Sequence, residues 1–195
     1  MISDVQPIDL SFEAIYETYH DRIYRYIHRM VFQSEIAEEI MQETFLRVHQ
    51  HLNTLQNPQA ISVWLYRIAT NLCHDEWRKQ GSGKQEHIES DEILEFAVDD
   101  SHPSLDVVID QNEMSDCIQR YITRLSDDYR LVILLHDLNN LTCTEIAEML
   151  GSTPGAIKIR LNRARLKLRT SLADACHFSN NTQGIFICDP KTKEC

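Results

Sequence analysis

The chain is poor in the two residues that most often interrupt regular structure, with 5 glycines and 5 prolines among 195 residues. Such scarcity favours helices over a turn-rich β architecture. No apolar run approaches the roughly 20 residues that a membrane-spanning helix needs. The N-terminal MISDVQPIDL also lacks the basic start and apolar core of a secretion signal. We therefore expect an all-α, cytoplasmic protein without membrane insertion.

The sequence also lacks the motifs that indicate an enzyme. It has no phosphate-binding glycine loop, no nucleophile motif and no convergent catalytic carboxylates. Its histidines are scattered without the spacing of a metal site. We expect no catalytic site and no required cofactor.

Two long stretches each lack one kind of charge: the first has no lysine or arginine and the second has no acidic residues. Residues 85–117 contain 11 acidic side chains and no Lys or Arg, whereas no acid lies between Gly151 and Leu172. The net charge of −11 is therefore concentrated away from the basic stretch, and it does not exclude nucleic-acid binding. Glycines 81 and 83 introduce the acidic region, whose high charge and weak periodicity predict a flexible linker.

Residues 141–169 predict two short helices joined by a sharp turn. Thr142 and Glu145 form a capping-box pattern, Gly151 suits a left-handed helix end, and Thr153 with Pro154 can open the second helix. The second helix has an inward face of Ile157, Leu161, Ala164 and Leu168, and six cations on its outer face. This is the pattern of a helix-turn-helix, whose second helix enters the DNA major groove. The alternative is a helical hairpin with a solvated basic face.

Apolar periodicity predicts further helices at residues 10–30, from a cap at Ser34 to about Leu52, at 61–80, at 105–122 and after a cap at Ser126. The inward sets include Met41 in the second helix and Ile68 and Trp77 in the third, whose exposed side includes Thr70. The first helix carries three arginines at three- and four-residue spacing on one face: Arg22, Arg25 and Arg29.

Two separate segments resemble a known family. Residues 37–48 (AEEIMQETFLRV) and 64–80 (WLYRIATNLCHDEWRKQ) look like sigma domain 2, and residues 125–169 look like sigma domain 4. The order of these patterns resembles the extracytoplasmic-function group of sigma-70 RNA polymerase sigma factors. The resemblance implies domain 2 at 10–80, an acidic linker at 81–106, domain 4 at 107–172 and a Cys-containing tail at 173–195.

The resemblance implies binding of core RNA polymerase and of promoter DNA at the −10 and −35 elements. The loop at 53–62 matches the segment that captures a flipped −10 base, which costs a few kcal/mol of unstacking. The resemblance also allows an anti-sigma factor as a partner of the chain. The implied polymerase-binding residues are Glu38, Glu39, Gln42 and Glu43, and the implied −10 contacts are Arg67, Asn71, His74 and Arg78.

The implied −35 contacts lie between Thr153 and Arg165, and physical reasoning divides them. Side chains near the start of a recognition helix face base edges, whereas later cations meet phosphates. We expect Ala156, Lys158, Ile159 and Arg160 to read bases, and Arg163, Arg165, Lys167 and Arg169 to contact phosphates.

The tail offers three thiols and one imidazole: Cys176, His177, Cys188 and Cys195. Four such groups could hold zinc or another thiophilic metal, and a metal or redox state could then tune activity. The spacing includes no CxxC pair, so a packing tail with incidental thiols is the alternative. A second function class is a sigma-like decoy that binds a regulator and not DNA, although it would have no need of a basic recognition face.

Overall fold

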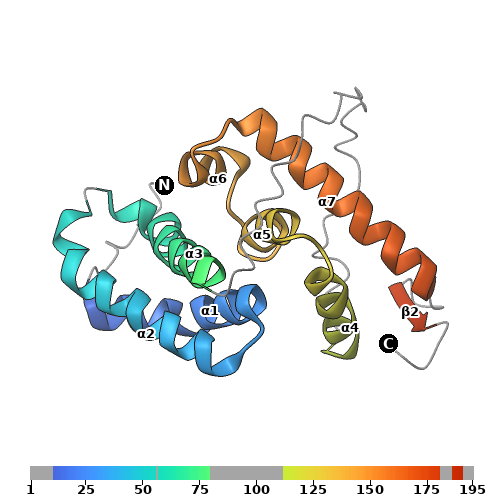
Figure 1. Cartoon of the computed structure of the whole chain (residues 1–195), viewed down its shortest axis with the longest axis horizontal. Coiled ribbons are helices and arrows are strands. Elements are labelled where there is room, and N and C mark those ends of the chain that lie inside the picture. Colours follow the sequence, from blue (N-terminus) through green and yellow to red (C-terminus); the bar gives the residue numbers. More distant parts are fainter. Residues whose placement is uncertain (1–10, 56, 80–111, 181–185, 191–195) are drawn as a thin grey trace, which may run out of the picture. The chain divides into compact units, whose positions relative to one another are not determined.

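A computed structural model describes residues 11–55, 57–79, 112–180 and 186–190. Figure 1 shows how helices dominate these ranges. Contacts divide the chain into two compact units, one within residues 1–83 and one within 84–195. The predicted linker lies outside the described residues. The elements are α1 (Phe12–Val31), α2 (Ser34–His51), η1 (Leu52–Thr54), η2 (Pro58–Ala60), α3 (Ile61–Lys79), α4 (Asn112–Thr123), α5 (Asp127–His136), α6 (Cys143–Leu150), α7 (Pro154–Ala175), β1 (Cys176–Asn180) and β2 (Phe186–Pro190).

Helices α1, α2 and α3 pack against one another and form the first unit. Ser11 caps α1 by accepting a hydrogen bond from the backbone N–H three residues later. Phe32 ends that helix in a left-handed conformation (φ 61°), which no sequence signal predicts. The cap predicted at Ser34 is wrong by one residue, because Gln33 holds the N-cap position and Ser34 is already helical.

The mainly apolar core of the first unit contains a buried hydroxyl pair between α1 and α3. The Thr70 hydroxyl donates to the carbonyl of Tyr66 at 2.6 Å and also lies 2.6 Å from the Tyr26 hydroxyl. Since Thr70 has one proton, Tyr26 must donate the second bond. Thr70 was expected on the exposed side but is 1% exposed. Met41, Ile68 and Trp77, expected inside, are only half-buried.

The second unit begins with α4 and α5, which a buried arginine joins. The Arg130 guanidinium donates to the carbonyls of Thr123 and Leu125, at 3.0 and 2.9 Å, and to the Asp127 carboxylate at 3.1 Å. It thereby satisfies carbonyls left open where α4 ends. Ser126 holds the N-cap position of α5 as predicted, but its side chain makes no capping hydrogen bond.

Helix α7 packs on α4, α5 and α6, so it is the element around which the second unit is built. Its side chains Ile157, Leu161, Ala164 and Leu168 are all buried, as their spacing predicts. The buried face of α5 supplies part of the opposing apolar surface, together with Ile146 and Ala147 of α6. The all-α prediction is confirmed for the body of both units.

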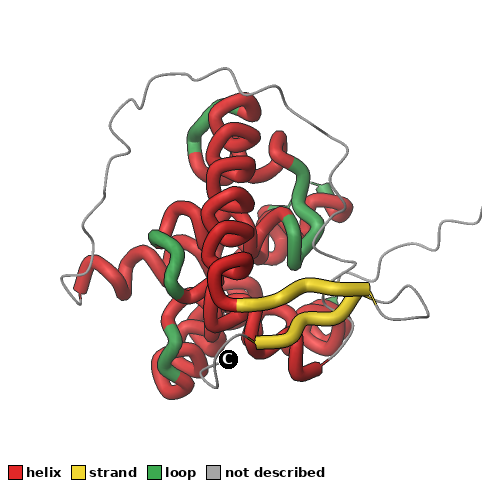
Figure 2. Tube along the Cα trace, turned by 90° about the vertical axis from the view of Figure 1, so that its right-hand side faces the viewer, coloured by secondary structure: helices red, strands yellow, loops and turns green. Residues whose placement is uncertain are grey.

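A two-stranded antiparallel hairpin follows α7 directly. Figure 2 shows both strands, in yellow, at the end of the long helix. The register pairs Cys176 with Pro190, His177 with Asp189 and Phe178 with Cys188. Cys176 is buried, and its backbone N–H donates to the carbonyl of Leu172 in the last turn of α7. The sequence did not indicate the first strand or the extension of α7 to Ala175.

Candidate nucleic-acid interface

The turn between α6 and α7 has the geometry that its sequence predicts. Thr142 Oγ1 accepts from the Glu145 N–H at 3.2 Å, and the Glu145 carboxylate accepts from the Thr142 N–H at 2.7 Å, which completes the capping box. Gly151 ends α6 at φ 63°. Thr153 then caps α7, with Pro154 as the first helical residue. The angle between the two helices is therefore set by local hydrogen bonds.

The start of α7 leaves its predicted base-reading side chains accessible. Thr153, Ala156, Lys158 and Ile159 are exposed, and Arg160 is half-buried. Ile159 is 46% exposed, which is high for an isoleucine and leaves its methyl groups able to meet another apolar group. The cations predicted to contact phosphate, Arg163 and Arg165, are half-buried.

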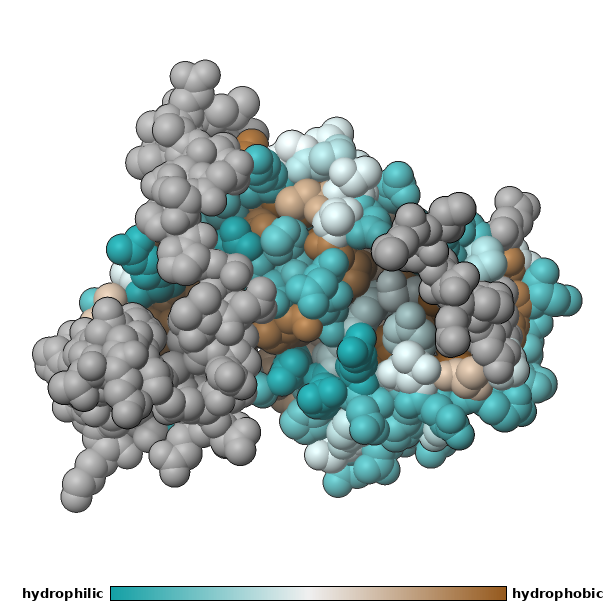
Figure 3. Space-filling view, turned by 180° about the vertical axis from the view of Figure 1, so that it is seen from behind, coloured by the Kyte–Doolittle hydropathy of each residue, from teal (hydrophilic) through white to brown (hydrophobic). Residues whose placement is uncertain are grey.

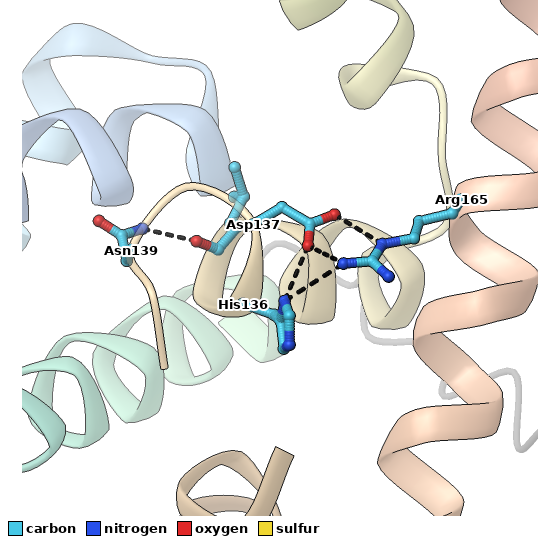
Figure 4. A network of polar contacts seen from close by, with 5 residues as sticks. His136, Asp137, Asn139 and Arg165 are labelled. Atoms are coloured by element: carbon cyan, nitrogen blue, oxygen red, sulfur yellow. Dashed lines mark hydrogen bonds and ion pairs between the residues drawn. The ribbon is translucent and has the colours of Figure 1, made fainter. Parts of the chain in front are cut away.

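Arg165 makes a bidentate ion pair with the buried carboxylate of Asp137, the residue that follows α5. Its Nε donates to Asp137 Oδ2 at 3.1 Å, and its Nη2 donates to Oδ1 of the same carboxylate (Figure 4). The Asp137 side chain is 2% exposed, whereas that of Arg165 is 36% exposed. Sequence reasoning missed this contact because the two residues are 28 positions apart.

His136 and Asn139 complete the network around Asp137. His136 Nδ1 lies 2.8 Å from Asp137 Oδ1 and 3.4 Å from Arg165 Nη2. Because Arg165 can only donate, a proton on Nδ1 satisfies the shorter contact and leaves the longer one as simple proximity. Asn139 donates to the Leu134 carbonyl at 2.6 Å, which holds the corner after α5.

The electrostatics of this corner favour an ionised Asp137. Burial raises the pKa of its carboxyl, but hydrogen bonds from His136 and Arg165, together with their charges, lower that pKa below its usual value. Asn140 then takes a left-handed conformation (φ 58°), as its position predicts. The corner therefore fixes both the approach to α6 and the side chain of Arg165.

Lys167, another predicted phosphate contact, has a contact within the protein as well. Its Nζ lies 5.7 Å from the ring centroid of Tyr129 on α5, within the range of a cation–π interaction. Exposed sites of this kind contribute roughly 0.5–1 kcal/mol. Lys167 remains exposed, so this contact does not prevent it from meeting a phosphate.

The predicted −10 contacts form one stripe along α3, because they follow each other at four-, three- and four-residue spacing. The first two are exposed, and the imidazole of His74 stacks on Trp77 with 5.1 Å between ring centroids. The last, Arg78, pairs with Asp75. The stripe consists of Arg67, Asn71, His74 and Arg78.

The predicted polymerase-binding residues lie on α2 beside an open groove of about 630 Å³ between α2 and α3. Glu38, Glu39 and Gln42 are exposed, and Glu43 accepts a hydrogen bond from Arg47 Nε at 2.8 Å. Glu39 and Glu43 line the groove, whose apolar part comes from Ile36, Ile40 and Leu72. Asp75 and Glu76 also line the groove, and so do the cations Arg47, Arg78 and Lys79, so its rim carries charges of both signs.

The predicted metal ligands fall mostly beyond what can be described. Cys195 lies outside the described residues, as do the side chains of His177 and Cys188; Cys176 is buried. Among the described residues, no three His, Cys, Asp or Glu side chains gather into a group that could hold a metal ion.

The surface is largely hydrophilic on the face drawn in Figure 3, with apolar residues in separate patches. The large apolar side chains that are exposed include Phe32, Leu46 and, at 60%, Leu166. Within the described ranges, none of the helices combines the length and apolar character needed to cross a membrane.

Two family models match the chain. The model for Sigma-70 region 2 matches residues 15–83, and the model for Sigma-70, region 4 matches residues 115–168. The first match covers α1, α2 and α3, and the second covers the helix-turn-helix with most of α4, all of α5 and α7 up to Leu168. Residues 169–195, including the hairpin, lie beyond both matches.

Relatives and solved structures agree with these matches. The chain is 35% identical to the ECF RNA polymerase sigma factor SigW of Bacillus subtilis, over 84% of this chain and 90% of SigW. It is 30% identical to the RNA polymerase sigma factor SigZ of Bacillus subtilis, over 91% and 96%.

Two solved structures share the fold. The first is the sigma factor RpoE of Bartonella quintana, solved with the anti-sigma factor NepR, with a TM-score of 0.62 at 22% identity. The match covers 83% of this chain and 96% of RpoE. CnrH, solved with the cytosolic domain of CnrY, has a TM-score of 0.58 at 19% identity, over 84% of this chain and 88% of CnrH.

Proposed function

Because the chain belongs to the extracytoplasmic-function group of sigma-70 RNA polymerase sigma factors, we propose that it directs promoter-specific transcription initiation. It would bind core RNA polymerase and carry no catalytic site of its own. The observation that carries this proposal is the capped helix-turn-helix, whose α7 starts with exposed Thr153, Ala156, Lys158 and Ile159.

The second unit would recognise the −35 element. The first turns of α7 are where a recognition helix meets base edges, so Ala156, Lys158, Ile159 and Arg160 would read sequence. Exposed Ile159 suits a thymine methyl group. Arg163 would contact phosphate, and Arg165, held by Asp137, would contact phosphate only if it left that pair or shared it.

The first unit would hold the opened −10 strand and the polymerase. Arg67, Asn71, His74 and Arg78 share one stripe of α3, and the 3-10 turns at 52–54 and 58–60 precede it. A base flipped from the −10 strand needs a pocket at this place. Glu38, Glu39, Gln42 and Glu43 would face core polymerase, next to the groove between α2 and α3.

Regulation would act on these surfaces. The structure of RpoE with the anti-sigma factor NepR supports an anti-sigma factor as a partner of this chain. A metal or redox response through Cys176, His177, Cys188 and Cys195 is a further part of the proposal; support for it comes from the sequence of the tail. The protein would work in the cytoplasm, where core polymerase is found.

Run-off transcription with bacterial core polymerase, on the upstream region of the protein's own gene, tests the proposal. We expect core-dependent, promoter-specific transcripts. A chain that neither binds core polymerase nor yields transcripts would favour the decoy function. Repeating the assay with a chelator, and with a chain truncated after Leu172, tests the tail: equal transcription in all cases would exclude regulation by metal there.

Arg160→Ala and Lys167→Ala test the division of the −35 contacts. The first should change promoter preference by roughly 1–3 kcal/mol at one base pair. The second should weaken binding evenly across sequences. Equal losses on all sequences at fixed salt would show that the division is wrong.

A further inference from the structure

Three arginines of α1 form a stripe that neither the fold nor the residues assigned above use. Arg22, Arg25 and Arg29 follow at three- and four-residue spacing, so they occupy one side of the helix. They are three of only 8 basic residues among the first 84, a region that is acidic overall. Three like charges on one face repel each other and are a cost to the isolated unit.

No carboxylate among the described residues neutralises this stripe through an ion pair. The acid nearest in sequence, Asp21, turns its carboxylate to His20 Nδ1 at 2.9 Å. Only its backbone carbonyl accepts from Arg25, through Nε at 3.1 Å. The guanidinium groups therefore keep most of their donors available.

The stripe borders the packing between α1 and α3. Tyr26 lies one residue after Arg25, and its ring packs on that of Tyr66 with 5.1 Å between centroids. Arg29 is half-buried beside this contact, whereas Arg22 and Arg25 are exposed. Tyr66 is followed in α3 by Arg67, the first member of the proposed −10 stripe, so the two cationic stripes flank one helix–helix contact.

The pKa shifts of Tyr66 and Arg29 agree with a cluster of positive charge at this place. Burial raises the pKa of the Tyr66 hydroxyl to about 12, and the charges of Arg22, Arg25 and Arg29 act in the opposite direction, which places all three near that hydroxyl. Desolvation and the charge of Arg25 lower the pKa of Arg29. A bound anion would raise the lowered pKa of Arg29 toward its usual value.

We propose that Arg22, Arg25 and Arg29 bind the phosphate backbone of the promoter strand that α3 holds at the −10 element. Arg22 and Arg29 stand about 10 Å apart along the helix axis, given a rise of roughly 1.5 Å per residue. That length covers more than one phosphate step, since charges on one strand of B-form DNA recur roughly every 3.4 Å. Guanidinium groups bind phosphate through paired, charge-assisted hydrogen bonds. The contacts position the strand and do not read its sequence.

The inference rests on the proposed function, so the experiment measures core binding and DNA binding separately. Holoenzyme is formed with core polymerase, and its affinity for fork-junction DNA from the upstream region of the protein's own gene is measured between 50 and 300 mM salt. A single-stranded phosphate contact contributes roughly 0.7 to the slope of log K against log salt. Relative to 1 M salt, where the contact is taken to contribute nothing, one such contact raises the affinity about fivefold at 0.1 M salt. Two contacts raise it about 25-fold.

We expect Arg25→Gln to weaken DNA binding about fivefold at 0.1 M salt and to lower the slope by roughly 0.7. The double variant Arg22→Gln/Arg25→Gln should lose about 25-fold. Both side chains are exposed, so the fold should persist. Arg25→Lys should keep the slope. The matched control is Arg124→Gln, which removes one charge at an exposed residue and should leave affinity unchanged.

The outcomes separate the two proposals. Promoter binding that is absent from wild-type holoenzyme refutes the proposed function. When wild type binds, equal effects of Arg25→Gln and Arg124→Gln overturn the inference alone. A loss of core binding in Arg25→Gln would assign the stripe to polymerase, and tighter DNA binding would assign it to an acidic segment of the chain itself; either result overturns the inference.

Discussion

Arg165→Ala should destabilise the second unit more than Asp137→Ala does, because the two partners differ in their access to water. The Asp137 side chain is 2% exposed and the Arg165 side chain 36% exposed. Removing Arg165 leaves a buried carboxylate that keeps its hydrogen bond with His136. Removing Asp137 leaves a guanidinium that can turn into solvent. A phosphate contact alone would predict no effect of Arg165 on stability.

The magnitudes follow from what each orphaned group can do. A stranded buried charge costs about 3–5 kcal/mol. Protonation offers Asp137 an escape, but from a usual pKa of about 3.9 it costs about 4 kcal/mol at pH 7, at roughly 1.36 kcal/mol per pH unit. Arg165→Ala should therefore cost about 3–4 kcal/mol. Asp137→Ala should cost about 1–2 kcal/mol, since water replaces most of the lost hydrogen bonds of Arg165.

Hydrogen exchange of the full chain is the appropriate assay. Both tryptophans, Trp64 and Trp77, lie in the first unit, so their fluorescence does not report on the second. Amide protection in α5 and α7 gives the opening free energy of the unit directly. Wild type, both single variants and the double variant are compared at pH 7.

The double variant decides between explanations. With both partners gone no charge is stranded, so Arg165→Ala/Asp137→Ala should be more stable than Arg165→Ala alone. The reasoning is refuted if Asp137→Ala is the more damaging single change, or if the double variant is no better than Arg165→Ala.

Two further predictions concern buried polar groups. Thr70→Val should destabilise the first unit by about 1–3 kcal/mol, because the Tyr26 hydroxyl loses its acceptor; urea unfolding followed by tryptophan fluorescence measures this. Thr70→Ser keeps the hydroxyl and should cost clearly less. An equal loss in both variants would contradict this account. Asp137→Asn should change the pH profile: the pKa of Asp137 is lowered by folding, so its contribution is complete above its unfolded value near 3.9 and is lost as pH falls through the folded value. Asp137→Asn should therefore be less stable at pH 7 and lose less protection below pH 4, and parallel profiles would count against the pair.

Local features of the fold could be predicted from the sequence because their causes lie within a few residues. The Thr142–Glu145 capping box, the left-handed Gly151 and the Thr153 cap each depend on side chains three or four positions apart. The buried face of α7 follows from the 3.6-residue period alone. Ser34 shows the limit of such reasoning, since a good capping residue one position away from Gln33 does not cap.

Contacts between distant segments could not be predicted in the same way. Thr70 is polar and lies three residues after exposed Arg67, so only its partnership with Tyr26, 44 residues earlier, explains its burial. Trp77 differs from its prediction for a local reason, since its ring stacks on His74 of the same helix instead of filling the core. The residues of the candidate site were predicted from sequence patterns, but their partners within the protein were not.

The ion pair between Arg165 and Asp137 also changes how many cations of α7 are expected to contact phosphate. The four cations of α7 that the sequence predicts to contact phosphate would give a slope of about −3.6 for log K against log salt on duplex DNA. Arg165 is held by a bidentate pair with a buried carboxylate, and leaving that pair would strand Asp137 at a cost of about 3–5 kcal/mol, more than one phosphate contact returns. Any loss of −35 binding in Arg165→Ala should then come from a displaced helix and leave the slope unchanged. A slope that falls by about 0.9 would instead show that Arg165 contacts phosphate.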